Sequence, residues 1–372
     1  MAELPLPGEQ NPFIRYRERL DSYRKGIDGG LSDTEFVDLA GNLDQAVAGV
    51  DGGGFGVTPV VSGAEIVRAA DLSSAVELWV KDETGNVSGS HKARHLFGAA
   101  LHTLVEQHLG TADDVNDRGL AIASCGNAAL AAGVIAAAMK RRLQVFVPTW
   151  ADVSVVERLK DLGAEITTCP RREGESGDPA YLRYREAAAA GAQPFSVQGT
   201  DTPTTFDGGR TLGWELAEQV EGIETLYVQV GGGALATAVS MAMPQASLYP
   251  IQTEGCAPLR RAWDRLEPGF DFDDAATHPG DFMWPWEQEP TSAATGILDD
   301  VTYDWLPLLR QTRATGGEPL VVPERRILEA YEIGRSATAI PVSATGTSGL
   351  AGLLHHRPEG GRVAVAFTGV ER

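Results

Sequence analysis

The stretch LAIASCGNAALAAGVIAAAMK, residues 120–140, sets the fold class of the chain. Leu120 to Ala123 form a short apolar run of the kind found in buried strands. A small polar turn from Ser124 to Asn127 follows, and an alanine-rich segment with helical character continues to about Lys140. A buried strand, a tight turn and an apolar helix in this order make one βα unit of a parallel sheet.

The same alternation continues on both sides of this stretch. In the first half, strands are predicted at 76–81, 144–148 and 165–169, and helices at 92–108 and 153–162. In the second half, strands are predicted at 225–230, 248–253 and 363–367, and helices near 210–220, from 235, at 323–335 and from 348. Residues 264–300, rich in Trp, Pro and Asp, are expected to be irregular. We therefore expect an α/β fold with open parallel sheets, preceded by helices in the first 50 residues.

Composition excludes several classes of protein. With 372 residues, 43% of them apolar, the chain is long enough for two domains with a sizeable core. Its net charge of −20 argues against nucleic acid and anionic membrane surfaces, and no apolar stretch of about 20 residues is available to span a bilayer. Three widely spaced cysteines, Cys125, Cys169 and Cys256, fit neither a disulfide framework nor a zinc site. We expect a reducing, cytoplasmic setting and no bound metal.

The segment SGSHKAR, residues 88–94, places Lys92 directly after a Gly/Ser turn and at the start of a predicted helix. A cation there faces the positive end of the helix dipole, and that environment favours the neutral amine. A neutral, nucleophilic amine is what a Schiff-base lysine requires. The alternative is a solvated lysine at a helix start, and this segment alone does not separate the two interpretations.

The turn from Ser124 to Asn127 lies at the carboxyl end of a predicted parallel strand, where open α/β sheets bind ligands. Gly126 allows close backbone approach, and the free amides of the helix start suit an anion. Asn127 adds a directed side-chain donor. The alternative is an ordinary strand-to-helix turn with an Asn cap.

Two further segments follow predicted strands in the second half. The glycines of VGGGALAT, residues 230–237, form an amide nest suited to a phosphate, although the segment is neither a P-loop nor a G-x-G-x-x-G fingerprint. A single terminal phosphate is therefore favoured over a nucleotide, with a plain tight turn as the alternative. Thr368 comes just after the last predicted strand and could point its hydroxyl into the same cleft, or could be only a polar strand end.

In their order and spacing, these four segments resemble the fold-type II pyridoxal-phosphate enzymes, a family that includes threonine synthase, serine/threonine dehydratase, cysteine synthase and the tryptophan synthase β subunit. The resemblance covers roughly residues 55 to 370 and includes Thr58-Pro59 and the threonine-synthase-like GRTLGWE at 209–215. It implies two open-sheet βαβ domains with a helical N-terminal extension, residues 1–55. Residues 1–112 and 195–372 would form a large cofactor-binding domain, and 113–194 a small domain that carries the substrate loop.

The resemblance also implies pyridoxal 5′-phosphate as the cofactor and assigns a role to each motif residue. Lys92 resembles the Schiff-base lysine, and His91 before it stands where dehydratases mostly have Phe. The other cofactor contacts implied are Asn127 at the 3′-oxygen, the phosphate loop Gly231, Gly232, Gly233 and Ala234, which is one glycine shorter than usual, and Thr368 at the pyridine nitrogen. The substrate contacts implied are the amides of Ser124, Cys125, Gly126, Asn127 and Ala128, with Arg94 as a further candidate.

These assignments favour a lyase that acts on a serine- or threonine-like amino acid and releases a 2-oxo acid and ammonia. A hydroxyl such as Thr368 cannot keep the pyridine nitrogen protonated, which favours loss of a β-substituent over transamination. Cys125 stands where relatives usually have Ser, Thr or Ala, so it could act as a second acid or only fill space. A β- or γ-replacement enzyme of the threonine synthase or cysteine synthase type, a different α/β enzyme, and a non-catalytic small-molecule binder stay open. We also expect a homodimer.

Overall fold

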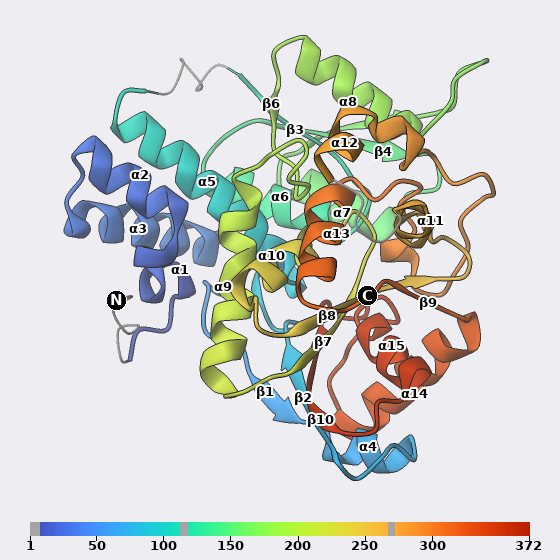
Figure 1. Ribbon diagram of the computed structural model, residues 1–372. Coiled ribbons are helices and arrows are strands. Elements are labelled where there is room, and N and C mark those ends of the chain that lie inside the picture. The colour runs from blue at the N-terminus through green and yellow to red at the C-terminus, as the bar shows by residue number, and fades with distance from the viewer. Residues whose placement is uncertain (1–7, 112–117, 267–271) are drawn as a thin grey trace. The chain divides into compact units, whose positions relative to one another are not determined.

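The computed structural model describes residues 8–111, 118–266 and 272–372, and the chain divides into two compact units (Figure 1). The first unit comprises Met1–Val57 and Asn86–Thr211, and the second comprises Thr58–Gly85 and Leu212–Arg372. The domain division expected from the sequence has one of its boundaries, 112/113, outside the described residues, and it stays a prediction. Among the described residues, no helix combines the length and apolar character that crossing a bilayer requires.

The first unit contains a four-stranded parallel sheet. Its strands stand in the order β5-β4-β3-β6, with the bounds β3 (Leu120–Ala123), β4 (Leu143–Pro148), β5 (Glu165–Cys169) and β6 (Gln193–Pro194). The helix α5 (Lys92–His108) precedes these strands in the chain, and α6 (Asn127–Ala138), α7 (Val153–Asp161) and α8 (Pro179–Ala189) connect them. The alanine-rich helix α6 is buried from Ala128 to Ala136, because small side chains let it pack closely against α5 and β3.

The expected N-terminal helices are present in the same unit. They are α1 (Pro12–Arg15), α2 (Asp21–Gly29) and α3 (Asp33–Asp51), with the 3-10 turns η1 (Arg17–Arg19) and η2 (Val87–Gly89). The rings of Phe13 and Phe55 pack against Phe97 of α5, with centroid distances of 4.3 and 4.7 Å. A capping box begins α3, because the side chains of Ser32 and Glu35 each bond the backbone N–H of the other residue.

A buried carboxylate on α9 (Thr205–Gln219) caps the start of α2. The side chain of Asp207 accepts the backbone N–H groups of Asp21 and Ser22 at 2.8 and 3.0 Å. It also bonds His102 Nε2 at 2.9 Å and Arg210 Nη2 at 2.5 Å. Burial alone would raise the pKa of Asp207, but the hydrogen bond and charge of His102 and the two backbone amides lower it to about 2.

Asp207→Asn is expected to destabilise the protein at neutral pH by about 2 kcal/mol, because the depressed pKa of Asp207 is a folding contribution. A carboxyl whose pKa is lower in the folded state stabilises above its unfolded pKa, 3.8, and loses that contribution as the pH falls toward 2. Thermal unfolding of both proteins between pH 7 and pH 2 measures the effect. We expect the difference in unfolding free energy to shrink below about pH 4, and a constant difference would contradict the assignment.

The second unit contains a six-stranded sheet in the order β1-β2-β10-β7-β8-β9, parallel except for β1, which runs antiparallel to β2. The strands are β1 (Val60–Ser62), β2 (Val76–Asp82), β7 (Thr225–Gln229), β8 (Ser247–Thr253), β9 (Leu320–Val322) and β10 (Gly361–Phe367). The helices are α4 (Ala64–Ala69), α10 (Ala234–Ala242), α11 (Pro258–Arg265), α12 (Phe272–Thr277), α13 (Trp305–Ala314), α14 (Glu324–Thr338) and α15 (Ser348–His356), with the 3-10 turns η4 (Pro279–Asp281) and η5 (Thr295–Ile297).

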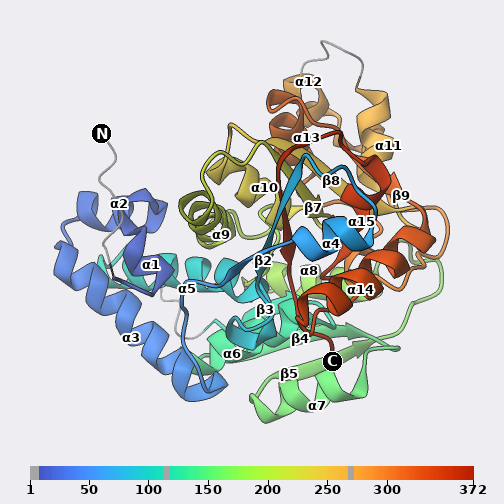
Figure 2. The same ribbon diagram turned by 90° about the horizontal axis from the view of Figure 1, so that it is seen from below.

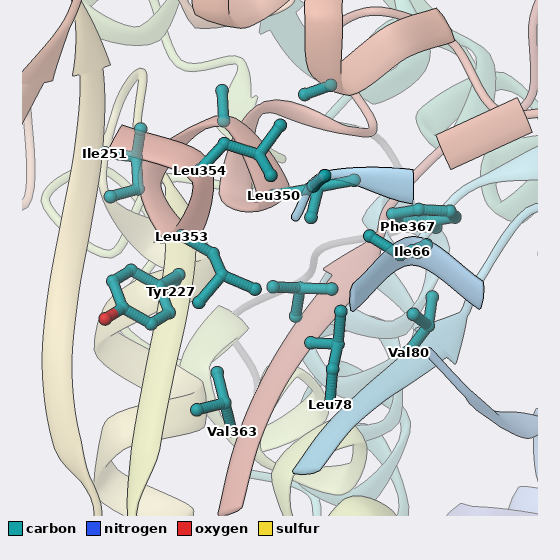
Figure 3. Close-up of a cluster of buried hydrophobic side chains, with 14 of the residues drawn as sticks. Ile66, Leu78, Val80, Tyr227, Ile251, Leu350, Leu353, Leu354, Val363 and Phe367 are labelled. Atoms are coloured by element: carbon teal, nitrogen blue, oxygen red, sulfur yellow. The ribbon is translucent and has the colours of Figure 1, made fainter. Parts of the chain in front are cut away.

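Both faces of this sheet are covered, which is why its strands read as nearly continuous apolar runs. Val363, Val365 and Phe367 of β10 face a cluster that also contains Tyr227 of β7 and Leu350 of α15 (Figure 3). The alternate residues of β7 and β10 face a second cluster, with α10 and α13. Figure 2 shows α4, α14 and α15 gathered on the first face.

The α/β class expected from the sequence is confirmed. The elements that were not predicted include β1, α4, α8, β6, α11, α13 and β9, and α9 begins at Thr205 rather than near 210. The segment expected to be irregular, 264–300, contains α12 and two 3-10 turns among its described residues, so that expectation was only partly correct.

Candidate active site

Lys92 is the first residue of α5, as predicted. The turn before it has left-handed backbone at Ser88 (φ 54°) and Gly89 (φ 68°), a conformation that an L-residue adopts at a cost. The Ser88 N–H donates to the Asp51 carboxylate at 2.7 Å, which ties this turn to the end of α3. The first turn of α5 contains no acidic residue to offset a cation.

The surroundings of the five lysines in the chain differ. Lys25, Lys140 and Lys160 are exposed. Lys81 is fully buried, and its Nζ lies 2.7 Å from Glu215 Oε2. Lys92 is half-buried at a helix start. Lys92 therefore differs in burial both from the three exposed lysines and from the fully buried Lys81.

Two buried polar atoms flank Lys92 in sequence without a hydrogen-bond partner among the described residues: Ser90 Oγ and His95 Nε2. His95 Nδ1 lies 3.1 Å from the Thr205 carbonyl oxygen, so Nδ1 carries the hydrogen and Nε2 keeps its lone pair. Burial, and secondarily the charge of Lys92, lower the pKa of His95 to about 3. A neutral imidazole and a hydroxyl left unsatisfied next to this lysine fit a polar ligand bound there.

Sequence reasoning missed both Ser90 and His95. The available signal in the sequence was the run of polar residues at the start of the predicted helix. His91, which sequence reasoning did single out, is the buried residue before α5, and its ring lies edge-on to that of His95 with centroids 5.9 Å apart.

Arg94 is fully buried, and its Nη1 donates to Thr211 Oγ1 at 3.0 Å. The contact joins α5 to α9 where two glycines meet. A Cβ added to Gly208 would lie 1.9 Å from the Arg94 carbonyl oxygen, and one added to Gly98 would lie 2.4 Å from the Gly208 nitrogen. This close crossing holds the helix that begins with Lys92. A substrate contact for Arg94 stays a prediction.

The turn Ser124–Asn127 joins β3 to α6, as predicted. Gly126 is the residue before α6, and its carbonyl accepts from the Leu130 N–H at 3.1 Å. Ser124 to Asn127 are half-buried and Ala128 is buried. Cys125 is not part of a disulfide. The first turn of α6 contains no acidic residue, so its amides present an uncompensated positive helix end that suits a carboxylate.

The glycine segment connects β7 to α10, also as predicted. Gly233 has a φ of 101°, which requires glycine, and a Cβ on Gly231 would lie 2.3 Å from Asp299 Oδ2. The Gly232 carbonyl accepts from the Asp304 N–H at 2.8 Å. This glycine cradle at the start of α10 fits a phosphate, and its neighbour Asp299 had no signal in the sequence.

Thr368 follows β10 directly and is 2% exposed. Its Oγ1 accepts from Gln229 Nε2 at 2.7 Å, so the last residue of β7 contacts the residue that follows β10. Sequence reasoning found Thr368 but missed Gln229.

Both units are α/β, with Lys92 at the start of α5 in the first unit and the glycine cradle before α10 in the second. The family described as "Pyridoxal-phosphate dependent enzyme" matches residues 52–369, so the chain belongs to that family. The resemblance inferred from the sequence is therefore confirmed, and so is pyridoxal phosphate as the cofactor of the family.

Individual relatives are distant. The chain is 26% identical over 283 residues to an L-threonine ammonia-lyase of Thermotoga maritima, covering 72% of this chain and 66% of the relative. It is 28% identical over 194 residues to a phenylserine dehydratase of Ralstonia pickettii, covering 50% and 55%. The match thus spans between half and two thirds of these curated relatives. A structure of maize serine racemase has a similar fold, with a TM-score of 0.67, 19% identity and coverage of 90% and 93%.

Proposed function

We propose that the protein is a pyridoxal-phosphate-dependent lyase that eliminates water from a serine- or threonine-like amino acid, after which hydrolysis of the resulting enamine consumes one water and gives a 2-oxo acid and ammonia. The observation that carries the proposal is the environment of Lys92: a half-buried amine at an uncompensated helix start, flanked by the unpartnered Ser90 Oγ and His95 Nε2. The names of the two curated relatives, an ammonia-lyase and a dehydratase, support elimination as the reaction.

In this proposal, one group of the residues singled out in the sequence binds the cofactor. Lys92 binds it covalently, beside His91. Asn127 donates to its 3′-oxygen, the amides of Gly231, Gly232, Gly233 and Ala234 hold its phosphate, and Thr368 faces its ring nitrogen. When bound, pyridoxal 5′-phosphate supplies the electron sink that stabilises the charge left at Cα.

The remaining roles concern the substrate. The amides from Ser124 to Ala128 hold its carboxylate, with Arg94 as a further contact. The freed amine of Lys92 takes the proton from Cα, and the resulting ammonium returns a proton to the β-hydroxyl, which leaves as water. Cys125 lies on the same turn and is proposed as a second acid.

The alternative is a replacement enzyme of the threonine synthase type, suggested by GRTLGWE and by Arg15-Tyr16-Arg17. Residues of both motifs have partners within the first unit. Arg210 pairs with Asp21 and Asp207, and Arg17 pairs with Asp33. These ion pairs give the motifs a structural reason that does not need a phosphorylated substrate, which favours the lyase.

The purified protein is expected to show near-visible absorbance that borohydride bleaches, and to form a 2-oxo acid and ammonia from serine or threonine. The measurement is a substrate panel of L- and D-serine, L- and D-threonine, cysteine, 2,3-diaminopropionate and phosphohomoserine, scored for 2-oxo acid, ammonia and phosphate. Phosphate release from phosphohomoserine alone would replace the lyase with the alternative. Absence of the absorbance after adding the cofactor would favour a non-catalytic binder.

A further inference from the structure

The amide of Gln229 is enclosed by acceptors of the second unit. Its Nε2 lies 2.7 Å from Thr368 Oγ1, 3.0 Å from the Gly346 carbonyl oxygen and 3.3 Å from those of Thr345 and Ala366. Gln229 itself is 5% exposed, at the end of β7. A polar side chain at the end of an apolar strand that leads into the glycine cradle is unusual enough to need a reason.

The orientation of this amide is fixed by its neighbours. Turning it over would place Oε1 against three carbonyl oxygens, which repel it, so the NH₂ group must be where Nε2 lies. In this orientation Oε1 is buried and has no partner in the described part of the chain. An unsatisfied buried oxygen destabilises the fold, so Gln229 is retained at a cost that an apolar side chain of the same size would avoid.

The hydrogen bond sets the polarity of Thr368. A hydroxyl has one hydrogen and two lone pairs, and the Gln229 N–H takes one of the lone pairs. Accepting this bond polarises the O–H group, which becomes a better donor and a poorer acceptor. We infer that Gln229 is a positioning residue that orients the Thr368 hydroxyl as a donor toward the ring nitrogen of the cofactor. The inference rests on the proposed function.

A ring nitrogen that accepts from Thr368 is held in its unprotonated form. The Thr368 hydroxyl polarised by Gln229 would thus keep the pyridine ring of the bound cofactor unprotonated. An unprotonated ring is a weaker electron sink than a protonated one, which suits loss of a β-substituent. A single protein–cofactor contact can be isolated with 1-deazapyridoxal 5′-phosphate, in which a C–H group replaces the ring nitrogen and cannot accept the bond.

The experiment measures the dissociation constants of pyridoxal 5′-phosphate and of its 1-deaza analogue from the apoprotein by absorbance titration. The readout is the ratio of the two constants, in which a general loss of folding or of phosphate binding cancels. In Gln229→Met we expect this preference for the nitrogen-containing ring to fall about five- to tenfold, the worth of one net hydrogen bond. Gln229→Glu, which keeps the shape but not the NH₂ group, is expected to lower the ratio in the same direction.

The matched control is Gln252→Met. Gln252 is a fully buried glutamine on the neighbouring strand β8, and its amide contacts Thr302 and the Leu259 N–H instead of Thr368. We expect an unchanged ratio there. In a Thr368→Val background, Gln229→Met should cause no further change, because the hydroxyl through which it acts is gone.

The outcomes distinguish failure of the proposed function from failure of the role inferred for Gln229. If wild-type protein binds neither compound, the proposed function fails. If wild-type protein binds both, but Gln229→Met weakens them equally or leaves the preference unchanged, Gln229 is only a packing residue and the inference is overturned. A further loss of preference in the Thr368→Val background would equally overturn it.

Discussion

Lys92→Ala is expected to abolish covalent attachment of the cofactor and to lower the rate of 2-oxo acid formation about a thousandfold or more. The variant loses both the nucleophile and the base that takes the Cα proton. It should nevertheless fold, because Lys92 is half-buried and begins α5 without an acidic neighbour in the first turn. Removing a cation from the positive end of a helix stabilises that helix by a few tenths to about 1 kcal/mol.

Lys92→Ala is thus expected to lose cofactor attachment but to gain helix stability, so one variant tests both effects. Absorbance with borohydride follows the cofactor, and thermal unfolding of the apoprotein follows the helix. The control is Lys160→Ala, an exposed lysine in the last turn of α7, for which we expect unchanged absorbance and no gain in stability, because a cation at that end of a helix is favourable. Borohydride-sensitive absorbance that persists in Lys92→Ala would remove Lys92 from the site.

Local sequence patterns predicted much of the fold. The bounds expected for the strands at 120–123 and 165–169 and for the helix at 92–108 are those observed, because each is delimited by turn residues and has a uniform apolar character. The strands that were missed are short and lie at sheet edges. The strand β9 has three residues and β6 has two, which is too few to show the alternation of apolar and polar residues that predicts a strand.

Contacts between distant residues could not be predicted in this way. Gln229 and Thr368 are 139 positions apart, and only the pairing of β7 with β10 brings their strands together. The motif residues were found because they lie in local turns at strand ends and helix starts, and their roles came from the family resemblance. Ser90, His95 and Gln229 were not, because burial without a partner is a property of the packed structure. The glutamine in the apolar run TLYVQV was the one local sign of an unusual strand end.

The ion pair of Lys81 is another contact between distant residues that local patterns could not predict. Its removal has the largest expected effect on stability. Lys81 on β2 is fully buried and donates to Glu215 and Gln219 of α9 and to the Thr58 carbonyl, each at 2.7 Å. Lys81 and Glu215 are 134 positions apart, so no local pattern indicates the pair. The Thr58 N–H also donates to Glu215, at 3.1 Å, which gives the Thr58-Pro59 motif a structural role.

Lys81→Met is expected to lower the free energy of unfolding by about 3–5 kcal/mol, because it removes one charge of a buried ion pair together with its hydrogen bonds to Glu215, Gln219 and Thr58. Denaturant unfolding at neutral pH measures the loss. Cofactor absorbance of the folded fraction should persist, since the proposed attachment is at Lys92.

A surface pair provides the control for charge loss alone. Lys25→Met breaks the exposed pair of Lys25 with Glu106 and should cost less than about 1 kcal/mol. The double variant Lys81→Met/Glu215→Leu removes both buried charges and should recover part of the loss, because a paired replacement avoids an isolated buried ion. If the double variant is as unstable as the sum of its single variants, the loss comes from packing and from the bonds of Thr58 and Gln219, and the ion pair itself contributes little.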